Sequence, residues 1–270
     1  SGLVAFRPDT KEVIFTDIFL PQEGCRCLTI APKHRKLYGI SYPRNHFFAY
    51  DIEKHHLCDI GRIGSINSQC VFIDHKENAY ITDDYGYLIK FNADTEKLTT
   101  LDTQIPHTSF FDGFHNVLYD VTPSPDEESV FGVMWNFNPR LFRYDFIRDK
   151  LYDFGKAYGK ESNEWSHLIH SHTGGLIFGP DRQLYFTSNF VTDDKNVPHL
   201  IKMNPDSGKR EVIGIISDHG IPADHISRAT ADFQGNLYFS EVGNTPTKLF
   251  KYSPEQAILS QNSFSPTRRY

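Results

Sequence analysis

Short runs of apolar and aromatic residues recur along the chain. Each run is followed by a few loop residues and then by a stretch in which apolar and polar positions alternate, as in a half-buried strand. The clearest runs begin at Leu37, Ala79, Val130, Leu184 and Leu237. The steps between these positions are 42, 51, 54 and 53 residues. A unit of nearly constant length that returns in this way indicates a repeat architecture.

Each unit is predicted to contain four short strands. The first strand precedes a turn such as residues 31–34, the second is the apolar run, the third alternates, and the fourth follows a turn such as residues 204–209. A near-continuous apolar run suits a strand that is covered on both faces. Helical periodicity is nowhere sustained. The pattern therefore predicts an all-β fold, a β-propeller of four-stranded antiparallel blades in which neighbouring blades bury one another's faces.

The repeat predicts one propeller domain over residues 1–270, with five to seven blades. Residues 3–7 match a third strand and residues 13–19 a fourth, so the chain is expected to start within a blade. Either residues after Ala257 complete that blade, or the sequence is a portion of a larger propeller, which we favour because residues 258–270 contain one weak strand. The expected boundaries are a half blade at 1–24 and blades at 25–66, 67–106, 107–169, 170–222 and 223–270.

Composition narrows the classes of function. The 22 Phe and 14 Tyr residues supply material for a large core, which excludes global disorder. Acidic residues number 34 against 28 basic ones, a net charge of −6, and no long basic run occurs. Nucleic acid and membrane are therefore not expected as partners. The apolar runs are too short to span a bilayer. These features leave the compartment open.

Candidate binding residues are sought in the loops. In a propeller the loops before first strands and after second strands gather at the two ends of a central channel, so a small-molecule or glycan ligand is expected at the channel mouth. These loops are polar, aromatic and of mixed charge, which suits a hydroxylated or carboxylated ligand. The residues predicted to bind substrate are Arg44, Arg228, Trp135, Asn189 and His170.

The densest group of ionisable residues lies at 165–175, where three histidines precede a Gly-Gly pair. An imidazole can act as a general base near neutral pH, and we assign that role to His172. The competing interpretation is that these residues are solvated loop histidines, since the chain has 13 histidines in all. No HExxH or comparable spacing supports a metal at this cluster.

Tyr42 is the second candidate for catalysis. A phenol can exchange a proton near neutral pH only if a nearby cation lowers its pKa, and Arg44 could pair with a substrate carboxylate. An ordinary turn between strands explains this segment equally well. Asp51 and Asp145 recur at one position of the repeat, which predicts turn residues. Glu241 ends an inner strand, where a buried carboxylate is costly unless it is paired, for example with Arg228.

Two segments, residues 172–187 and 231–241, resemble blades of the virginiamycin B lyase-like and SMP-30 gluconolactonase-like propellers. They carry the sequences Gly-Pro-Asp-Arg-Gln-Leu-Tyr-Phe-Thr and Asp-Phe-Gln-Gly-Asn-Leu-Tyr-Phe-Ser. The first resemblance implies a His and a Glu on a late blade with bound Mg²⁺; Glu241 matches the Glu, whereas Ser227 and Arg228 stand where the His is wanted. The second implies a divalent cation held by Glu, Asn and Asp, for which Asn189 is a partial match. A divalent cation, Mg²⁺ or Ca²⁺, with Glu241 as a ligand, is the cofactor that the resemblance implies.

Three functions stay open. The first is a carbohydrate-active lyase on a uronic-acid-containing glycan, in which His172 or Tyr42 removes the proton beside a carboxylate that Arg44 or Arg228 neutralises. The second is a metal-dependent lactonase or hydrolase, and the third is a non-catalytic propeller that binds a glycan or a protein. We favour the first because arginines occur in these loops together with imidazole and phenol groups.

Overall fold

The structure is a computed structural model that describes residues 1–65, 68–106, 116–135, 139–157, 173–192 and 195–254. These residues form strands and turns, and no helix occurs among them. The described part accordingly contains no helix that is long and apolar enough to cross a membrane. The chain divides into two compact units, Ser1–Gln104 and Ile105–Tyr270, here called unit 1 and unit 2.

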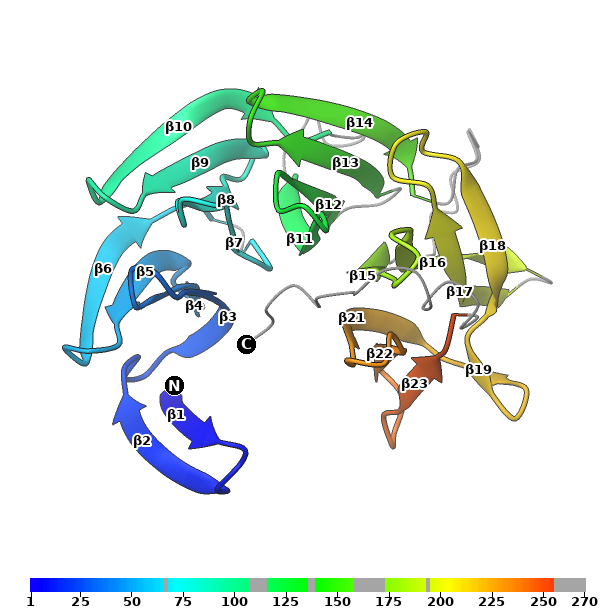
Figure 1. Ribbon diagram of the computed structural model, residues 1–270, viewed down its shortest axis with the longest axis horizontal. Coiled ribbons are helices and arrows are strands. Elements are labelled where there is room, and N and C mark those ends of the chain that lie inside the picture. Colours follow the sequence, from blue (N-terminus) through cyan, green and yellow to red (C-terminus); the bar gives the residue numbers. More distant parts are fainter. Residues whose placement is uncertain (66–67, 107–115, 136–138, 158–172, 193–194, 255–270) are drawn as a thin grey trace. The chain divides into compact units, whose positions relative to one another are not determined.

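Unit 1 contains one two-stranded sheet and two four-stranded sheets, all antiparallel (Figure 1). The two-stranded sheet consists of β1 (Gly2–Arg7) and β2 (Glu12–Ile18). The next sheet consists of β3 (Gly24–Ala31), β4 (Lys36–Tyr42), β5 (His46–Asp51) and β6 (His56–Arg62). The last consists of β7 (Phe72–Ile73), β8 (Ala79–Thr82), β9 (Tyr87–Asn92) and β10 (Lys97–Gln104). Each strand pairs with the strand that follows it in its sheet.

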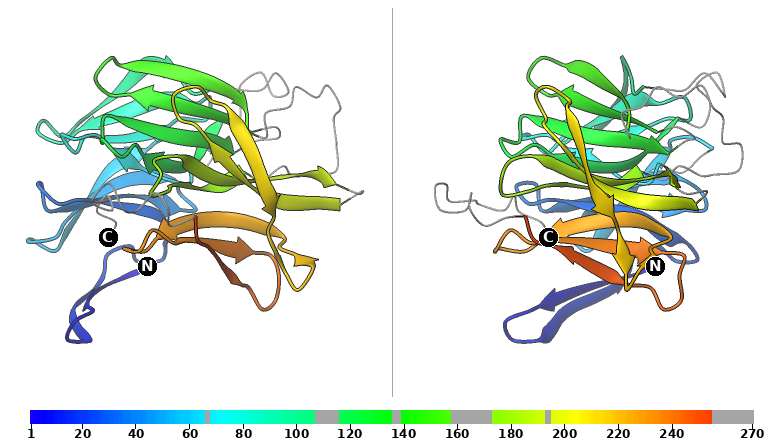
Figure 2. Two further views of the ribbon diagram at one scale, coloured as in Figure 1. Left: turned by 45° about the vertical axis from the view of Figure 1, so that its right-hand side comes forward. Right: turned by 90° about the vertical axis from the view of Figure 1, so that its right-hand side faces the viewer.

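Unit 2 continues the same pattern. Its first sheet consists of β11 (Val117–Pro123), β12 (Ser129–Trp135), β13 (Arg140–Asp145) and β14 (Lys150–Lys156). The second consists of β15 (Thr173–Phe178), β16 (Leu184–Thr192), β17 (Lys195–Met203) and β18 (Arg210–Ile215). A short hairpin, β19 (Ser217–Asp218) and β20 (Ile221–Pro222), precedes a three-stranded sheet of β21 (His225–Ala231), β22 (Leu237–Val242) and β23 (Leu249–Tyr252). Figure 2 shows β16 and β17 as the longest hairpin of the unit, paired out to Thr192 and Lys195.

The strand pattern confirms the predicted class, an all-β propeller with antiparallel blades. Burial follows the position of the strand in its sheet. All four residues of the second strand β8 are buried, whereas the fourth strand β10 is mostly exposed. The near-continuous apolar runs thus form strands covered on both faces, as their sequence predicts.

Successive sheets within each unit pack face to face. In unit 1, Tyr38 and Phe47 of the first four-stranded sheet pack against Phe91 of the next, with ring centroids 5.5 and 5.4 Å apart from it. In unit 2, Phe131 of β12 packs in the same way against Phe178 of β15 at 5.3 Å. Each sheet therefore buries apolar surface that it could not bury alone.

In each four-stranded sheet, an Asp or Asn side chain at the same position stabilises the turn between the third and fourth strands. The side-chain oxygen of Asp51 accepts hydrogen bonds from the backbone N–H groups of the residues two and three positions later. Asn92, Asp145 and Asn204 make the same two bonds in the other four-stranded sheets. Asp51 and Asp145 are therefore turn residues, as predicted.

The turns between first and second strands share a different device. The fourth residue of each turn has a positive φ and donates its N–H to the carbonyl of the first. The residues concerned are Arg35, Glu77, Glu127, Arg182 and Gly235. Glu77 has a φ of 62° and its backbone N–H bonds the Asp74 carbonyl at 2.8 Å. This backbone geometry fixes the place from which the Glu77 side chain leaves its sheet.

First strands carry a β-bulge in four of the described sheets, at β3, β11, β15 and β21. In β11 the pairing passes from Leu118 to Asp120, so Tyr119 is the extra residue. In β21 the pairing passes from Ile226 to Arg228, so Ser227 is the extra residue. A bulge changes the direction in which the following side chain points. Asp120 and Arg228 are thus the redirected residues of two different sheets.

Candidate functional site

The candidate site of unit 2 is built on three first strands. β11, β15 and β21 lie side by side, with β15 in contact with both of the others (Figure 1). Arg228 of β21 extends to Asp120 of β11, and its Nη1 atom lies 3.7 Å from the Asp120 Oδ1 atom. The guanidinium also lies over the Tyr119 ring, 5.3 Å from its centroid. A predicted binding residue is therefore held by a carboxylate on one side and an aromatic face on the other.

Asp120 is a buried carboxylate, with 5% of its surface exposed. Burial raises the pKa of its carboxyl group, although the Arg228 charge and the N–H groups of Leu176, Val121 and Gly175 oppose that change. Its Oδ2 atom accepts the Leu176 N–H at 2.9 Å and its Oδ1 atom the Val121 N–H at 3.0 Å. The half-exposed Arg228 side chain thus pairs with a carboxylate that backbone N–H groups hold in place.

The Gly-Gly pair predicted beside the histidine cluster lets the strands approach. A Cβ atom on Gly174 would lie 3.0 Å from the Ile226 carbonyl oxygen and 3.1 Å from that of Ser227. Gly175 has a φ of 69°, which residues with a side chain rarely adopt. These two glycines therefore allow β15 to lie against β21 and to direct N–H groups at Asp120.

Asn189 and Glu241, two other predicted residues, meet at Asp224. The Asn189 Nδ2 atom donates to the Asp224 carbonyl at 2.9 Å, and the Asp224 backbone N–H donates to Glu241 Oε1 at 3.0 Å. Asn189 and Glu241 are both buried. The Asn189 Oδ1 atom is buried with no hydrogen-bond partner in the described part of the chain.

His225 follows Asp224, and its Nδ1 atom lies 3.0 Å from the Asp224 carboxylate. An imidazole that donates through Nδ1 to a carboxylate presents Nε2 as its basic nitrogen. The strand register places Val242 opposite His225 and Ile226 opposite Glu241. His225 thus lies two residues before Ser227, the first of the two positions where the virginiamycin B lyase-like resemblance wants a His.

Tyr42 and Arg44 lie in unit 1. Tyr42 ends β4, and the Arg26 guanidinium, at the bulge of β3, lies 5.7 Å from the centroid of its ring. Arg44 is exposed and its Nη1 atom lies 3.2 Å from Glu23 Oε1. A cation does lie near the Tyr42 ring, but it belongs to Arg26. The catalytic role of Tyr42 and the binding role of Arg44 stay predictions.

Three predicted residues cannot be placed as side chains. His170 and His172 lie outside the described residues, and only the backbone of Trp135, at the end of β12, is described. Their roles also stay predictions.

The described residues contain no group of three or more His, Cys, Asp or Glu side chains arranged to hold a metal ion. The Glu241 carboxylate accepts hydrogen bonds from the backbone N–H groups of Asp224 and Lys248 and from the Asn244 side chain. Three donors thus reach its two oxygens, and they leave acceptor capacity on the carboxylate. The role of Glu241 as a metal ligand stays a prediction.

Sequence reasoning missed Asp120, Tyr119 and Asp224. Asp120 lies in an otherwise apolar first strand, Leu118 to Val121, and this break in the pattern was the available signal. Nothing in the sequence connects it with Arg228, 108 positions later (228 − 120). Asp224 was visible only as the residue before His225.

Comparisons with known proteins give the fold. No known family profile and no curated protein sequence matches this chain. Solved structures do match it. A streptogramin B lyase aligns with a TM-score of 0.59 at 13% identity, over 87% of this chain and 70% of the other. The chain has the fold of a β-propeller. This confirms the resemblance drawn from the two blade segments.

Two further propellers are similar to this one. Virginiamycin B lyase from Staphylococcus aureus aligns with a TM-score of 0.58 at 14% identity, over 85% of this chain and 69% of the other. Regucalcin, a calcium-binding protein from Agrobacterium tumefaciens, aligns with a TM-score of 0.55 at 14% identity, over 81% and 68%. The structural alignments establish the shared propeller fold. At identities this low, the activity has to be argued from the site.

Proposed function

We propose that this propeller is a carbohydrate-active lyase that binds a uronic-acid-containing glycan through Arg228. The observation that supports the proposal is the setting of the Arg228 side chain, 42% exposed, stacked on Tyr119 and held by the buried Asp120. A guanidinium recognises a carboxylate through paired hydrogen bonds and keeps its charge at any physiological pH. Tyr119 offers an aromatic surface beside the same cation.

The reaction would be a β-elimination. Neutralising the uronate carboxylate makes the C–H bond beside it more acidic, so that a general base can remove that proton. The electrons of the C–H bond form a C=C bond, and the glycosidic C–O bond breaks with its electrons on oxygen, which takes up a proton. Among the described residues we assign the base to His225, which Asp224 orients. Tyr42 and His172 are the alternatives predicted from the sequence.

The test is turnover on a panel of uronic-acid polysaccharides, followed by the ultraviolet absorbance of the unsaturated product. We expect one member of the panel to be cleaved. Arg228→Ala should lower kcat/KM by about two orders of magnitude, the scale of losing a charged hydrogen-bonded contact. His225→Ala should lower kcat with little change in KM.

Arg140→Ala is the matched control, since Arg140 pairs with Asp153 between the third and fourth strands of its sheet. It should leave turnover unchanged. Absence of product on every polysaccharide, or an Arg228→Ala enzyme as active as the wild type, would overturn the proposal. A saturable thermal shift without turnover would instead identify a binding propeller, because a ligand that binds the native state stabilises it.

A metal-dependent lactonase is the second candidate, and one observation favours it. The Asn189 Oδ1 atom is buried without a partner in the described part of the chain, and amide oxygens are ligands for Ca²⁺ and Mg²⁺. The neighbouring Asp224 carboxylate is 55% exposed. This candidate predicts a rise in melting temperature with CaCl₂ or MgCl₂ that Asn189→Ala abolishes, and lactone hydrolysis that a chelator stops.

A further inference from the structure

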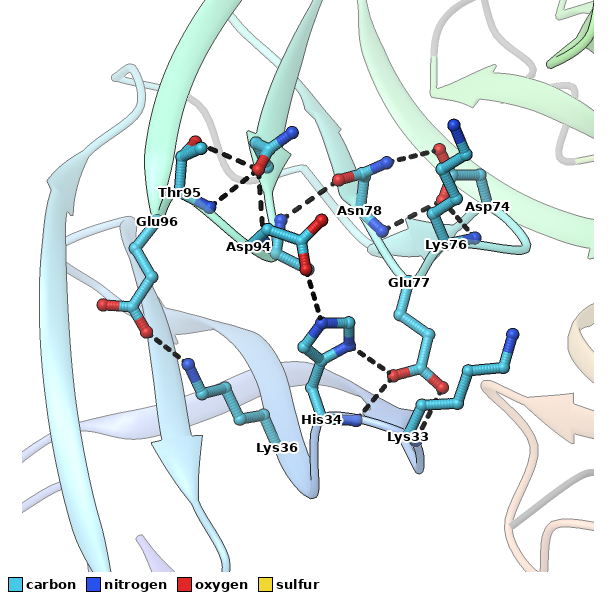
Figure 3. Close-up of polar contacts among 12 residues, drawn as sticks. Lys33, His34, Lys36, Asp74, Lys76, Glu77, Asn78, Asp94, Thr95 and Glu96 are labelled. Atoms are coloured by element: carbon cyan, nitrogen blue, oxygen red, sulfur yellow. Dashed lines mark hydrogen bonds and ion pairs between the residues drawn. The ribbon is translucent and has the colours of Figure 1, made fainter.

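His34 lies between two carboxylates that come from a neighbouring sheet of unit 1 (Figure 3). It sits in the turn between β3 and β4. Its Nδ1 atom lies 2.8 Å from Glu77 Oε2, in the β7–β8 turn, and its Nε2 atom lies 3.3 Å from Asp94 Oδ1, in the β9–β10 turn. Ionised carboxylates only accept hydrogen bonds, so both ring nitrogens can be satisfied together only if both carry a proton. The contact is complete only with a positively charged imidazolium.

The two carboxylates differ in their surroundings. The Glu77 side chain is 3% exposed and also accepts the backbone N–H groups of Lys33 at 2.8 Å and of His34 at 2.9 Å. The Asp94 side chain is 81% exposed. A neutral ring can donate through one nitrogen only, and the bond to the buried Glu77 is the shorter one. Loss of the ring's positive charge should therefore release Asp94 first.

Lys33, Lys36 and Tyr38 are further ionisable groups of the same region. Lys33 donates through Nζ to the His75 carbonyl, and Lys36 is paired with Glu96. The buried Tyr38 phenol lies near the same carboxylates, and burial together with the charges of Glu77, Glu96 and Asp94 raises its pKa to about 12. It is therefore neutral over the range in which His34 titrates. Glu77 and Asp94 are the carboxylates hydrogen-bonded to the ring.

We propose that His34 is a pH-sensitive bridge between sheet β3–β6 and sheet β7–β10, closed when the ring is charged and released from Asp94 when it is neutral. The proposal concerns a regulatory contact and does not depend on the lyase assignment.

The direction of the pH effect follows from both partners. The hydrogen bond to Glu77 raises the pKa of His34 above 6.5, against the opposing effect of burial and with further help from Asp94. The stabilisation is therefore fully present below about pH 6.5 and disappears as pH rises through the higher folded value. Burial opposes ionisation of Glu77, but the N–H groups of Lys33 and His34 outweigh it and lower its pKa. Its contribution is lost as pH falls through that lowered value, so the bridge is closed between these two limits.

The experiment measures the ring directly in the full chain. Nuclear magnetic resonance of the His34 ring nitrogens should find both protonated at pH 6, with a midpoint above that of an unstructured histidine. A double-mutant cycle of His34→Gln and Asp94→Asn should show a coupling of about 2 °C in melting temperature near pH 6, which vanishes near pH 9.

His46→Gln is the control, because the His46 Nδ1 atom pairs with Asp59, a carboxylate of the same sheet. It removes an imidazole from the same sheet without removing a bridge between sheets. A His34 midpoint at or below the ordinary value, or a His34–Asp94 coupling equal at both pH values, would overturn the proposal. An Asp94→Asn variant that folds normally keeps the test informative even if His34→Gln is unstable.

Discussion

The His34 bridge and the Asp120–Arg228 pair join sheets in the two units by opposite means. The His34 bridge connects turns at the surface, and one of its carboxylates, Asp94, is almost fully in water. The Asp120–Arg228 pair connects first strands, and its carboxylate is buried and fixed by backbone N–H groups. Exposed ion pairs contribute little and are screened by salt, whereas breaking a buried pair leaves an unsatisfied charge.

The difference in burial suits the two contacts to different roles, although both have the same kinds of residue, basic and acidic. Each pair joins residues of opposite charge from different sheets. The bridge can open and close at small cost, so it is suited to respond to pH. The buried Asp120 carboxylate is costly to disturb, so it is suited to hold the half-exposed, ligand-binding Arg228 in place.

Asp120→Ala should destabilise the protein by about 3 kcal/mol, because three backbone N–H groups and the Arg228 charge would lose their acceptor. Chemical unfolding measures the change. Asp153→Ala is the matched control: Asp153 pairs with Arg140 in the same unit, but its side chain is 37% exposed, and the loss should stay below about 1 kcal/mol. Equal losses would remove the distinction between the buried and the exposed carboxylate.

Gly174→Ala should cost about 1 to 2 kcal/mol, because the added methyl group would press on two carbonyl oxygens of β21 and on the Tyr119 ring. Thermal unfolding is a sufficient measurement. Gly214→Ala in β18 is the control, since a Cβ there meets no atom within 4 Å. A Gly174→Ala protein as stable as the control would mean that β15 does not need this close approach to hold Asp120.

The two regions should also respond to acid in opposite directions. Burial raises the pKa of Asp120, so this residue binds protons more tightly in the folded than in the unfolded state, and its contribution falls as pH rises from its ordinary value of 3.8 through the higher folded value. The pKa of Glu77 is lowered, so its contribution grows as pH rises through the lowered value towards its ordinary 4.5. Unfolding free energies of Asp120→Asn and Glu77→Gln, each subtracted from the wild type, should therefore slope in opposite senses. Parallel slopes would contradict the contrast.

The sequence predicted the blades well because their signals are local. Tyr38, Gly39 and Ile40 of the apolar run are buried in β4, and the Asp51 turn forms as expected, since strand burial and Asx turns depend on neighbouring residues. A bulge is less visible. The one in β21 shifts the register between Ile226 and Arg228, and no residue there marks it in advance.

The candidate site was only partly predictable. Arg228, Asn189 and Glu241 are predicted in loops, whereas they lie within β21, β16 and β22. The partners that define their chemistry, Asp120 and Asp224, come from the packing of separate strands. The role of His34 is not predictable from the sequence, because a histidine in a turn has no distinguishing pattern. Its two carboxylates lie 43 and 60 positions away along the chain.

Among these variants, Arg35→Gln should change the stability of the protein least. Arg35 follows His34 in the same turn and pairs with Glu53 at 2.6 Å, but the two side chains are 63% and 61% exposed. Water already solvates both charges, so removing one should change stability by less than about 0.5 kcal/mol, and added salt should erase even that. Thermal unfolding of Arg35→Gln and His34→Gln at low and high salt tests this. A loss for Arg35→Gln as large as that for His34→Gln would mean that any charge in this turn serves equally, and that the buried Glu77 carboxylate confers nothing particular on the bridge.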